Sequence, residues 1–302
     1  MATLEIKLWW GKPTFFMTII NGKTKLLGVI GDPIGHTLSP LMHNAAIDAL
    51  GLNYVYLPLP IAPENLATAI AGLSAIDLEG FSVTIPHKLA IIPLLSQITE
   101  KARLVGAVNT VWRTKTGWQG TNTDVDGFLA PLKSLDKDWS RVNPVILGNG
   151  GAARAVVVAC AQLGCGEIHV VGRNQKKLDP FKESWANTSL YDLLEVHGWD
   201  ELEGLLSTTE LLINSTPIGM SPQGEQSPVE LELLDLLPSS AIAYDLIYNP
   251  RPTKFLRLAQ TRGIRIIDGL EMLVNQGAIA LEIWLGQPVP VSVMREALLK
   301  QF

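Results

Sequence analysis

The stretch Val145-Ile-Leu-Gly148-Asn-Gly150-Gly151-Ala-Ala153 decides how the second half of this 302-residue chain folds. It fits the pattern G-x-G-x-x-A, directly after a predicted strand and at the start of a predicted helix. Gly148 permits a tight turn, Gly150 lets the backbone approach a pyrophosphate, and Ala153 lets the helix pack closely on the strand. The helix N-terminus adds N–H donors and a positive dipole. This context favours a dinucleotide-binding βαβ unit, and a glycine turn that binds no ligand is the alternative.

The residues after the next predicted strand indicate which dinucleotide would bind. An NAD site carries an acidic residue about 20 residues after the glycines. Here the strand Glu167–Val171 is followed by Gly172-Arg173-Asn174-Gln-Lys176-Lys177, which contains no acid. Arg173 has the planar donor fork that suits a 2′-phosphate, and the lysines add positive charge. The sequence therefore favours NADP over NAD, and a solvated basic helix start is the alternative.

Strands and helices alternate on both sides of this stretch. The first half predicts strands at Leu26–Gly31, Tyr54–Leu59 and Gly80–Thr84, helices at Ser39–Leu50 and Pro63–Ala71, and a hairpin joining Val108–Trp112 to Trp118–Thr121. The second half predicts strands at Pro144–Leu147, Glu167–Val171, Leu211–Ser215, Ala241–Leu246 and Ile264–Ile267, and helices at Gly150–Leu163, Asn174–Ala186, Thr253–Arg262 and Gly269–Gly286. Strands separated by such helices form βαβ units and parallel sheets. We therefore expect an α/β fold with two sheets and a ligand cleft between them.

Composition excludes several classes of function. Lys and Arg number 24 and Asp and Glu 29, a net charge of −5, which argues against nucleic-acid binding. The apolar run Ala155–Ala161 is far shorter than the roughly 20 residues of a membrane helix. Two cysteines, and no closely spaced pair among five histidines, argue against a disulfide framework and a metal site. We expect a cytoplasmic protein without a secretory signal or bound metal.

Several polar residues outside the glycine stretch are ambiguous when each is taken alone. Lys88 follows a predicted strand and a Pro86 turn, where a surface lysine is the ordinary interpretation. Asp124 alone is a turn or cap residue. Thr37 and Ser39, two hydroxyls in a strand-to-helix loop, are explained by helix capping.

Taken together, eight motifs in order resemble the shikimate dehydrogenase family of the bacterial single-function type, from about Gly28 to the C-terminus. They are Gly31-Asp-Pro with His36-Thr-Leu-Ser39-Pro40, Val83-Thr84-Ile-Pro86-His-Lys88, Gly106-Ala-Val-Asn109-Thr110, Asn122-Thr-Asp124, Gly148-Asn-Gly-Gly-Ala152, Asn214-Ser-Thr-Pro-Ile-Gly219-Met220, Asp245-Leu-Ile-Tyr248, and Gly269-Leu-Glu-Met-Leu-Val-Asn-Gln276. Eight motifs in this order are far more specific than any one of them.

The resemblance implies an enzyme that reduces 3-dehydroshikimate to shikimate with NADPH, in the pathway to chorismate and the aromatic amino acids. It implies a substrate domain from residues 1–123, completed by helices in 269–302, and an NADP-binding domain over 124–268. Separately, residues 1–16 precede Met17 and the first predicted strand and contain no clear element, so we expect them to be a flexible extension or to lie before the true start of the protein. Lys88 and Asp124 would form the catalytic pair that handles the proton of the C3 oxygen.

The resemblance also implies the binding residues. Matching positions for the substrate carboxylate are Thr37, Ser39 and Tyr248, and those for the ring hydroxyls are Thr84, Asn109, Asp124 and Gln276. Matching positions for NADP are Gly148, Asn149, Gly150, Gly151, Ala152, Gly172, Arg173, Asn174 and Lys177 on the phosphate and adenosine side, Leu246 and Gly269 on the nicotinamide side, and Glu100 as a weaker position.

Some positions depart from the family pattern. Many members have Ser where Thr37 stands and Asn where Ser82 stands, and Gly172-Arg173-Asn174 replaces the commoner Asn-Arg-Thr. The added methyl of Thr37 leaves the choice between shikimate and quinate open. One alternative is a quinate/shikimate dehydrogenase of broader specificity. The other is a non-catalytic dehydrogenase-like module, and the intact Lys88 and Asp124 argue against this second alternative. The chain would be a monomer or a homodimer.

Overall fold

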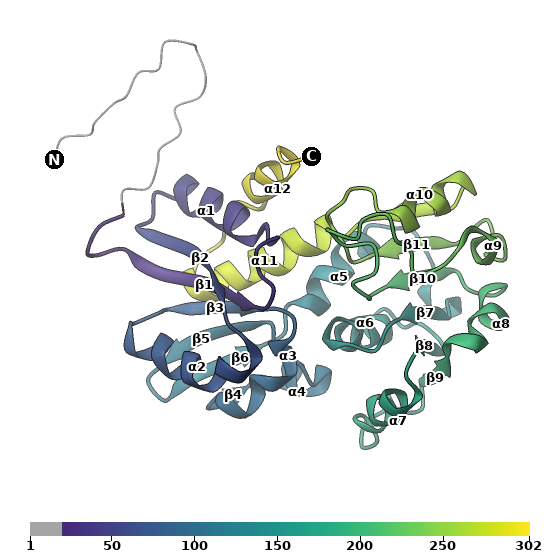
Figure 1. Cartoon of the computed structure of the whole chain (residues 1–302), viewed down its shortest axis with the longest axis horizontal. Helices are drawn as coiled ribbons and strands as arrows, with labels where there is room; N and C mark the ends of the chain where they lie inside the picture. The colour runs from purple at the N-terminus through teal and green to yellow at the C-terminus, as the bar shows by residue number, and fades with distance from the viewer. Residues whose placement is uncertain (1–19) are drawn as a thin grey trace, which may run out of the picture.

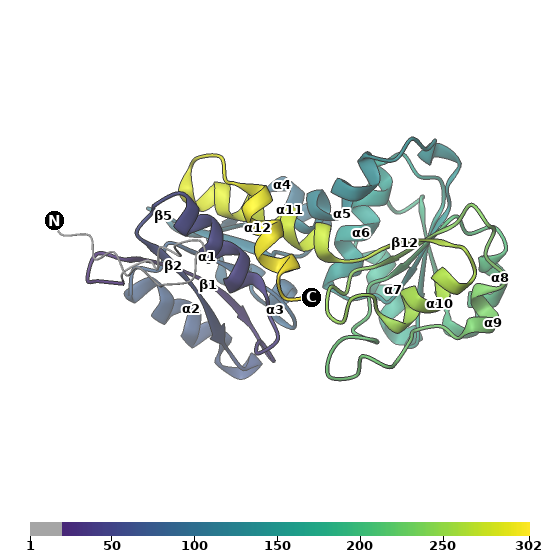
Figure 2. The same ribbon diagram turned by 90° about the horizontal axis from the view of Figure 1, so that it is seen from above.

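The structure is a computed structural model that describes residues 20–302. The extension expected over residues 1–16 therefore lies outside the described residues. Two six-stranded sheets form two lobes that lie side by side (Figures 1 and 2). The expected α/β class with two sheets is confirmed.

The first sheet has the strand order β2-β1-β3-β5-β6-β4. Its strands are β1 (Lys25–Gly31), β2 (Tyr54–Pro60), β3 (Gly80–Val83), β4 (Gln97–Ile98), β5 (Thr110–Thr114) and β6 (Gly117–Thr121). Strand β1 runs parallel to β2 and β3, while β5 is antiparallel to β3 and β6, which confirms the predicted hairpin.

Helices cover both faces of this sheet because side chains alternate along β1. Leu27 and Val29 pack with α1 (Ser39–Ala49), whereas Ile30 packs on the other face with α2 (Leu66–Ala75). Short helices α3 (His87–Ala90) and α4 (Glu100–Val105) also belong to this lobe, with 3-10 turns at Pro63–Asn65 and Ile92–Leu94.

The C-terminal helices return to the first sheet rather than covering the second. Helix α11 (Leu270–Leu285) and helix α12 (Val291–Leu299) share a hydrophobic cluster with β1 and α1. The Trp284 Nε1–H donates to the carbonyl oxygen of Val111 at 2.8 Å. Helix α11 starts at the junction of the lobes and runs across the first one (Figure 2).

The second sheet is parallel throughout, in the order β12-β11-β10-β7-β8-β9. Its strands are β7 (Pro144–Leu147), β8 (Ile168–Gly172), β9 (Leu194–Gly198), β10 (Leu211–Asn214), β11 (Ile242–Asp245) and β12 (Arg265–Ile267). Its helices are α5 (Asp124–Lys133), α6 (Gly151–Gln162), α7 (Gln175–Glu183), α8 (Leu202–Leu206), α9 (Leu231–Leu234) and α10 (Lys254–Thr261), with 3-10 turns at Trp139–Arg141 and Trp199–Glu201. The strand order reverses between β7 and β10, and ligands bind at the carboxyl ends of strands at such a point.

Some elements differ from the sequence-based expectation. Residues 195–210 carry no apolar run, yet they contribute to β9 and α8. Strand β9 lies at the sheet edge, where only Leu194 of its five residues is buried, so the usual apolar signal of a strand is missing. Helix α7 ends at Glu183, three residues earlier than expected, after a Pro180 in its last turn.

Helix α1 carries a buried histidine on its inner face. The His43 ring is fully buried and stacks on Tyr56 with ring centroids 4.1 Å apart. Its Nδ1 lies 2.8 Å from the Ser39 carbonyl oxygen, whereas its Nε2 has no partner among residues 20–302. Burial lowers the pKa of His43 to about 4, although backbone contacts favour the charged ring.

This histidine predicts acid sensitivity of the folded state. The unfolded chain takes up the proton near pH 6.5 and the native chain only near pH 4, so stability is lost as the pH falls between those values. The loss attributable to His43 is about 3 kcal/mol. Urea unfolding at several pH values measures it. His43→Gln is expected to flatten the pH dependence of the unfolding free energy, and His36→Gln, which replaces an exposed histidine, is expected to leave it unchanged. The same pH dependence in the wild type and both variants would contradict this assignment.

Candidate active site

A lysine and an aspartate meet between the two lobes. Lys88 lies in α3, just after β3 and the turn at Pro86, and Asp124 is the first residue of α5. The Lys88 Nζ lies 2.5 Å from Asp124 Oδ2, and the side chains are 14% and 6% exposed. The tertiary structure thus joins two predicted residues that are 36 positions apart in the sequence. A charge-assisted hydrogen bond with so little exposure is stronger than the same pair in water.

The second oxygen of Asp124 is held by a neutral amide. The buried Asn109 Nδ2 lies 2.9 Å from Asp124 Oδ1 and 2.9 Å from Thr123 Oγ1. Asn109 Oδ1 accepts the backbone N–H of Thr123 at 2.7 Å, and Asn122 Oδ1 accepts that of Asp124 at 3.0 Å. These bonds fix the carboxylate plane, so that Lys88 meets one oxygen while Asn109 meets the other.

Close packing of α5 on α11 brings Gln276 to the same point. A Cβ at Gly127 would lie 2.7 Å from the Met272 carbonyl oxygen and 2.8 Å from Gln276 Cβ, so only a glycine allows this approach. Gln276 Oε1 consequently lies 3.2 Å from Asn109 Nδ2. Four predicted site residues, Lys88, Asn109, Asp124 and Gln276, therefore form one polar cluster.

The three hydroxyls expected to hold a carboxylate also converge. Thr37 Oγ1 lies 3.2 Å from Ser39 Oγ, and the Tyr248 hydroxyl faces the Thr37 side chain and the Leu38 backbone. Burial raises the pKa of Tyr248. Because Ser39 begins α1, these groups surround a helix N-terminus, where backbone N–H groups and the dipole favour an anion.

Thr84 lies four positions before Lys88 in the chain. It follows β3, and its Cγ2 is only 2.5 Å from the position that a Cβ at Gly31 would take. Its hydroxyl has no hydrogen-bond partner among residues 20–302, so it is free to meet a ligand.

The glycine stretch forms the turn that the sequence predicts. Gly148 has φ +100°, and a Cβ there would lie 2.9 Å from Thr216 Cγ2. A Cβ at Gly150 would meet no atom within 4 Å, and this open face lies at the N-terminus of α6, where Ala152 falls in the first turn. Asn149 Nδ2 is buried without an acceptor in the described part of the chain. Open space and unpaired donors at a helix N-terminus fit a pyrophosphate.

The glycine turn and the lysine belong to one site. A Cβ at Gly151 would lie 3.3 Å from Lys88 Cβ, so α6 begins against α3. A dinucleotide on α6 would therefore reach toward the Lys88–Asp124 pair.

The remaining predicted cofactor residues occupy three further places. Arg173, Asn174 and Lys177 are exposed at the start of α7, after Gly172 ends β8, and neither cation forms an ion pair among residues 20–302. At the junction of the lobes, a Cβ at Gly269 would lie 2.2 Å from the Leu246 carbonyl oxygen. Glu100 is exposed at the first residue of α4, and no hydrogen bond or ion pair joins it to the other described site residues.

The sequence alone gave no role to three polar side chains that the structure buries. His87 follows the turn at Pro86, where a solvent-facing side chain is the ordinary expectation. It is nevertheless 1% exposed, and its Nε2 lies 2.7 Å from the Ile61 carbonyl oxygen, which anchors α3. Arg154 is buried over Trp185, and its Nε–H donates to the Val105 carbonyl oxygen at 2.7 Å; burial lowers its pKa to about 10. Asp245 is fully buried, and burial raises its pKa to about 7. The burial of Arg154 could have been suspected from its place directly before the apolar run of α6.

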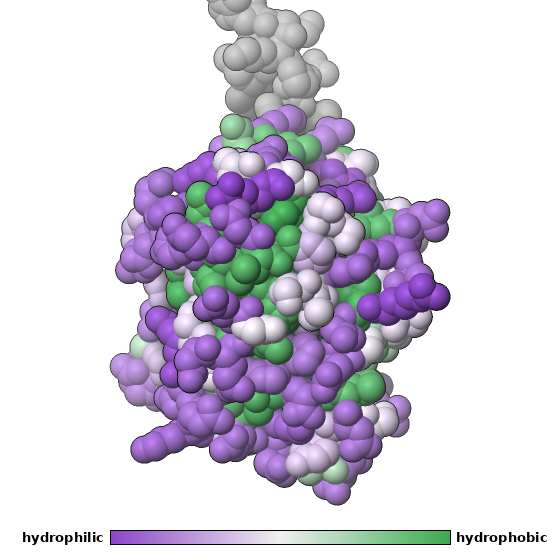
Figure 3. Space-filling model, turned by 90° about the vertical axis from the view of Figure 1, so that its right-hand side faces the viewer, coloured by the Kyte–Doolittle hydropathy of each residue, from purple (hydrophilic) through white to green (hydrophobic). Residues whose placement is uncertain are grey.

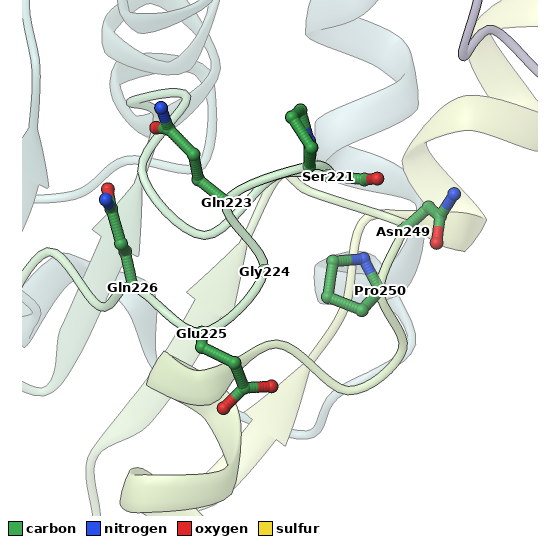
Figure 4. Close-up of a pocket in the computed structure, with 8 residues that line it drawn as sticks. Ser221, Gln223, Gly224, Glu225, Gln226, Asn249 and Pro250 are labelled. Atoms are coloured by element: carbon green, nitrogen blue, oxygen red, sulfur yellow. The ribbon is translucent and has the colours of Figure 1, made fainter.

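A separate hollow of about 480 Å³ lies between the loop Ser221–Gln226 and Asn249–Pro250 (Figure 4). Its lining residues include none of the predicted site residues. The face of the second lobe in Figure 3 is mainly hydrophilic, with hydrophobic areas among the hydrophilic ones. Within residues 20–302, no helix is long and apolar enough to cross a membrane, and no three His, Cys, Asp or Glu side chains gather as metal ligands.

Comparisons with known proteins show which family the chain resembles over almost its whole length. Residues 29–111 match the family described as "Shikimate dehydrogenase substrate binding domain", and residues 269–299 match "Shikimate 5'-dehydrogenase C-terminal domain". A curated relative from Microcystis aeruginosa, "Shikimate dehydrogenase (NADP(+))", is 97% identical over 286 residues, which cover 95% of this chain and 100% of the relative.

Solved structures share the whole fold. A crystal structure of a shikimate dehydrogenase in complex with NADP+ is 38% identical, with a TM-score of 0.85, over 94% of this chain and 98% of that one. The ligand-free 5-ketofructose reductase of a Gluconobacter strain is 35% identical, with a TM-score of 0.79, over 93% and 100% of the two chains. By these matches the chain belongs to the shikimate dehydrogenase family of NADP-dependent oxidoreductases.

Proposed function

We propose that this chain catalyses the reversible reduction of 3-dehydroshikimate to shikimate with NADPH, and that Lys88 and Asp124 handle the proton of the C3 oxygen. The observation that carries the proposal is the 2.5 Å contact between Lys88 Nζ and Asp124 Oδ2, beside the start of α6. The reaction belongs to the pathway toward chorismate and the aromatic amino acids.

The residues of the pair have distinct tasks in this reaction. In the direction of oxidation, the C3–H bond of shikimate breaks as hydride leaves, and the C3–O bond becomes a carbonyl as the hydroxyl proton leaves. NADP+, when bound, takes up the hydride. The Lys88 ammonium donates to the C3 oxygen and stabilises the negative charge that develops on it, while Asp124 orients Lys88 and accepts the released proton through the pair. Asn109 keeps the Asp124 carboxylate in place for this transfer.

The substrate is held from two sides. The hydroxyls of Thr37, Ser39 and Tyr248 bind its carboxylate at the N-terminus of α1, and Thr84, Asn109, Asp124 and Gln276 bind the ring hydroxyls. The convergence of the three hydroxyls at a helix N-terminus supports the first assignment. The unpaired hydroxyl of Thr84 and the Asn109–Gln276 contact support the second.

The carboxyl ends of the second sheet would hold NADP(H). Gly148–Ala152 would bind the pyrophosphate, Gly172, Arg173, Asn174 and Lys177 would bind the adenosine 2′-phosphate, and Leu246 and Gly269 would contact the nicotinamide. The open face at Gly150 and the unpaired cations at Arg173 and Lys177 support these roles. Glu100 is the weakest member of the set.

The domain division follows the two sheets. Residues 1–123 and 269–302 form the substrate domain, and residues 124–268 form the NADP-binding domain. The shared cluster of α11, α12 and β1 supports this division. The enzyme works in the cytoplasm, as a monomer or homodimer, and has no nucleic-acid partner. The free, buried cysteines support the reducing compartment, and the net charge of −5 supports the absence of a nucleic-acid partner.

Reduction of NADP+ by the purified protein tests the function. We expect rapid turnover of shikimate with NADP+ and little turnover with NAD+, since Arg173 and Lys177 suit a 2′-phosphate. Comparable turnover of quinate would make the chain a quinate/shikimate dehydrogenase, in which the methyl group of Thr37 is tolerated. Folded protein that binds NADPH without any turnover of shikimate would contradict the proposal.

Removal of the lysine tests its catalytic role. Lys88→Ala is expected to reduce kcat for shikimate by about 10²–10⁴-fold, because proton transfer then lacks its positioned group. The dissociation constant of NADPH, measured by fluorescence titration, is expected to change little. Lys101→Ala is the matched control, because Lys101 pairs with Asp126 at 2.6 Å between α4 and α5. Near-normal kcat in Lys88→Ala would refute the role.

Removal of the arginine tests the cofactor choice. Arg173→Ala is expected to raise the dissociation constant of NADPH about ten-fold and to leave that of NADH nearly unchanged, because only NADPH carries the 2′-phosphate. Arg141→Ala, which removes an exposed arginine from the same lobe, serves as the control. An equal loss of affinity for both cofactors would disprove this assignment.

A further inference from the structure

One buried carboxylate connects three segments around the junction of the lobes. Asp245 ends β11, is fully buried, and forms no ion pair among residues 20–302. Its Oδ1 accepts the Asn214 Nδ2–H at 3.0 Å and the Ile247 backbone N–H at 3.1 Å. Its Oδ2 accepts the Thr253 hydroxyl at 2.7 Å. All three donors are neutral, and they lie at the end of β10, just after β11 and at the start of α10.

The first donor leads to the glycine turn. Asn214 Oδ1 accepts the backbone N–H of Thr216 at 3.0 Å and its hydroxyl at 2.7 Å, while Asn214 Nδ2 lies 3.2 Å from the Ile218 carbonyl oxygen. These bonds shape the turn after β10. That turn packs over Gly148, where a Cβ would lie 2.9 Å from Thr216 Cγ2.

The second donor lies between a cofactor residue and a substrate residue. Ile247 is flanked by Leu246, proposed beside the nicotinamide, and Tyr248, which faces Thr37. The Ile247 carbonyl oxygen also accepts the Gly269 N–H at 3.1 Å, at the start of α11. A bond to Ile247 therefore sets the backbone that carries both residues.

The third donor secures the chain that follows. Thr253 is 1% exposed and caps α10, with its Oγ1 3.4 Å from the Leu256 N–H. The segment 246–252 is thus held at its second residue and just beyond its end by the same carboxylate.

We propose that Asp245 is a positioning residue that fixes the substrate contact of Tyr248 and the cofactor contacts of Leu246 and Gly148 together. The two oxygens of one buried carboxyl group hydrogen-bond to three partners at once, and their removal leaves buried donors unpaired, which favours rearrangement of the segments that carry them. The proposal rests on the proposed roles of Tyr248 and Leu246.

Four variants test this inference. Asp245→Ala is expected to raise the KM for shikimate and the dissociation constant of NADPH together, each about ten-fold. Asp245→Asn is expected to restore most of both, because its carbonyl accepts from Asn214 and Ile247 while its amide donates to the Thr253 oxygen. Thr253→Val removes one donor and is expected to raise both values less. Thr209→Val is the matched control: Thr209 is 1% exposed, and its hydroxyl donates at 2.8 Å to the Leu205 carbonyl oxygen in the same lobe.

The melting temperature of each variant separates positioning from general stability. A structural role alone would lower the melting temperature of Asp245→Ala and Thr253→Val, as of Thr209→Val, with unchanged KM and NADPH affinity; that result would overturn the proposal. If Asp245→Ala fails to fold, Thr253→Val and Asp245→Asn decide by the same comparison. Failure of the proposed function is distinguishable, because it appears as inactive wild-type protein or as an unchanged KM for shikimate in Tyr248→Phe.

Discussion

Close packing of α11 holds the two lobes and the site between them. At its start, Gly269 lies against the Leu246 carbonyl oxygen; in its middle, Gln276 lies against Gly127 of α5; near its end, Trp284 lies against Gly80 of β3. A Cβ at any of these glycines would fall within 2.9 Å of its neighbour, which real side chains do not tolerate. The helix thus links the proposed nicotinamide side, the Asn109–Asp124 cluster and the first sheet in one rigid element.

Buried polar groups give this packing its specificity. Asn109 and Asp124 at the lysine, and Asn214 and Asp245 at the second sheet, are each satisfied by several partners of fixed direction. Hydrophobic contacts alone would permit small shifts of α5 or of the segment after β11, whereas a buried network is satisfied in one arrangement. The hydride and proton transfers proposed here require such fixed positions, because reacting groups must approach within about 3–3.5 Å.

The accuracy of the sequence-based predictions followed the strength of the local signal. Strands β1, β7, β10 and β11 are buried apolar runs and were predicted nearly to the residue. Strand β9 was missed because an edge strand with one buried residue lacks that pattern. His87 was misjudged because a histidine in a turn has no local property that reveals a buried carbonyl 26 residues away. The site residues were anticipated through the order of eight motifs, since none of them is informative alone.

The sequence by itself determined the class of fold, the glycine turn and the preference for a 2′-phosphate. The fold class follows from the alternation of apolar strands and helices along the chain. The glycine turn follows from Gly148 to Ala153, and the preference for a 2′-phosphate from Arg173 without a nearby acid. Only the tertiary structure decided that Lys88 meets Asp124, that Gln276 joins Asn109, and that Asp245 serves three segments. Apart from the bonds of Asp245 to Ile247 and Thr253, those contacts join residues 31 to 167 positions apart, and their energy arises from burial and direction, which exist only once the surrounding elements have packed.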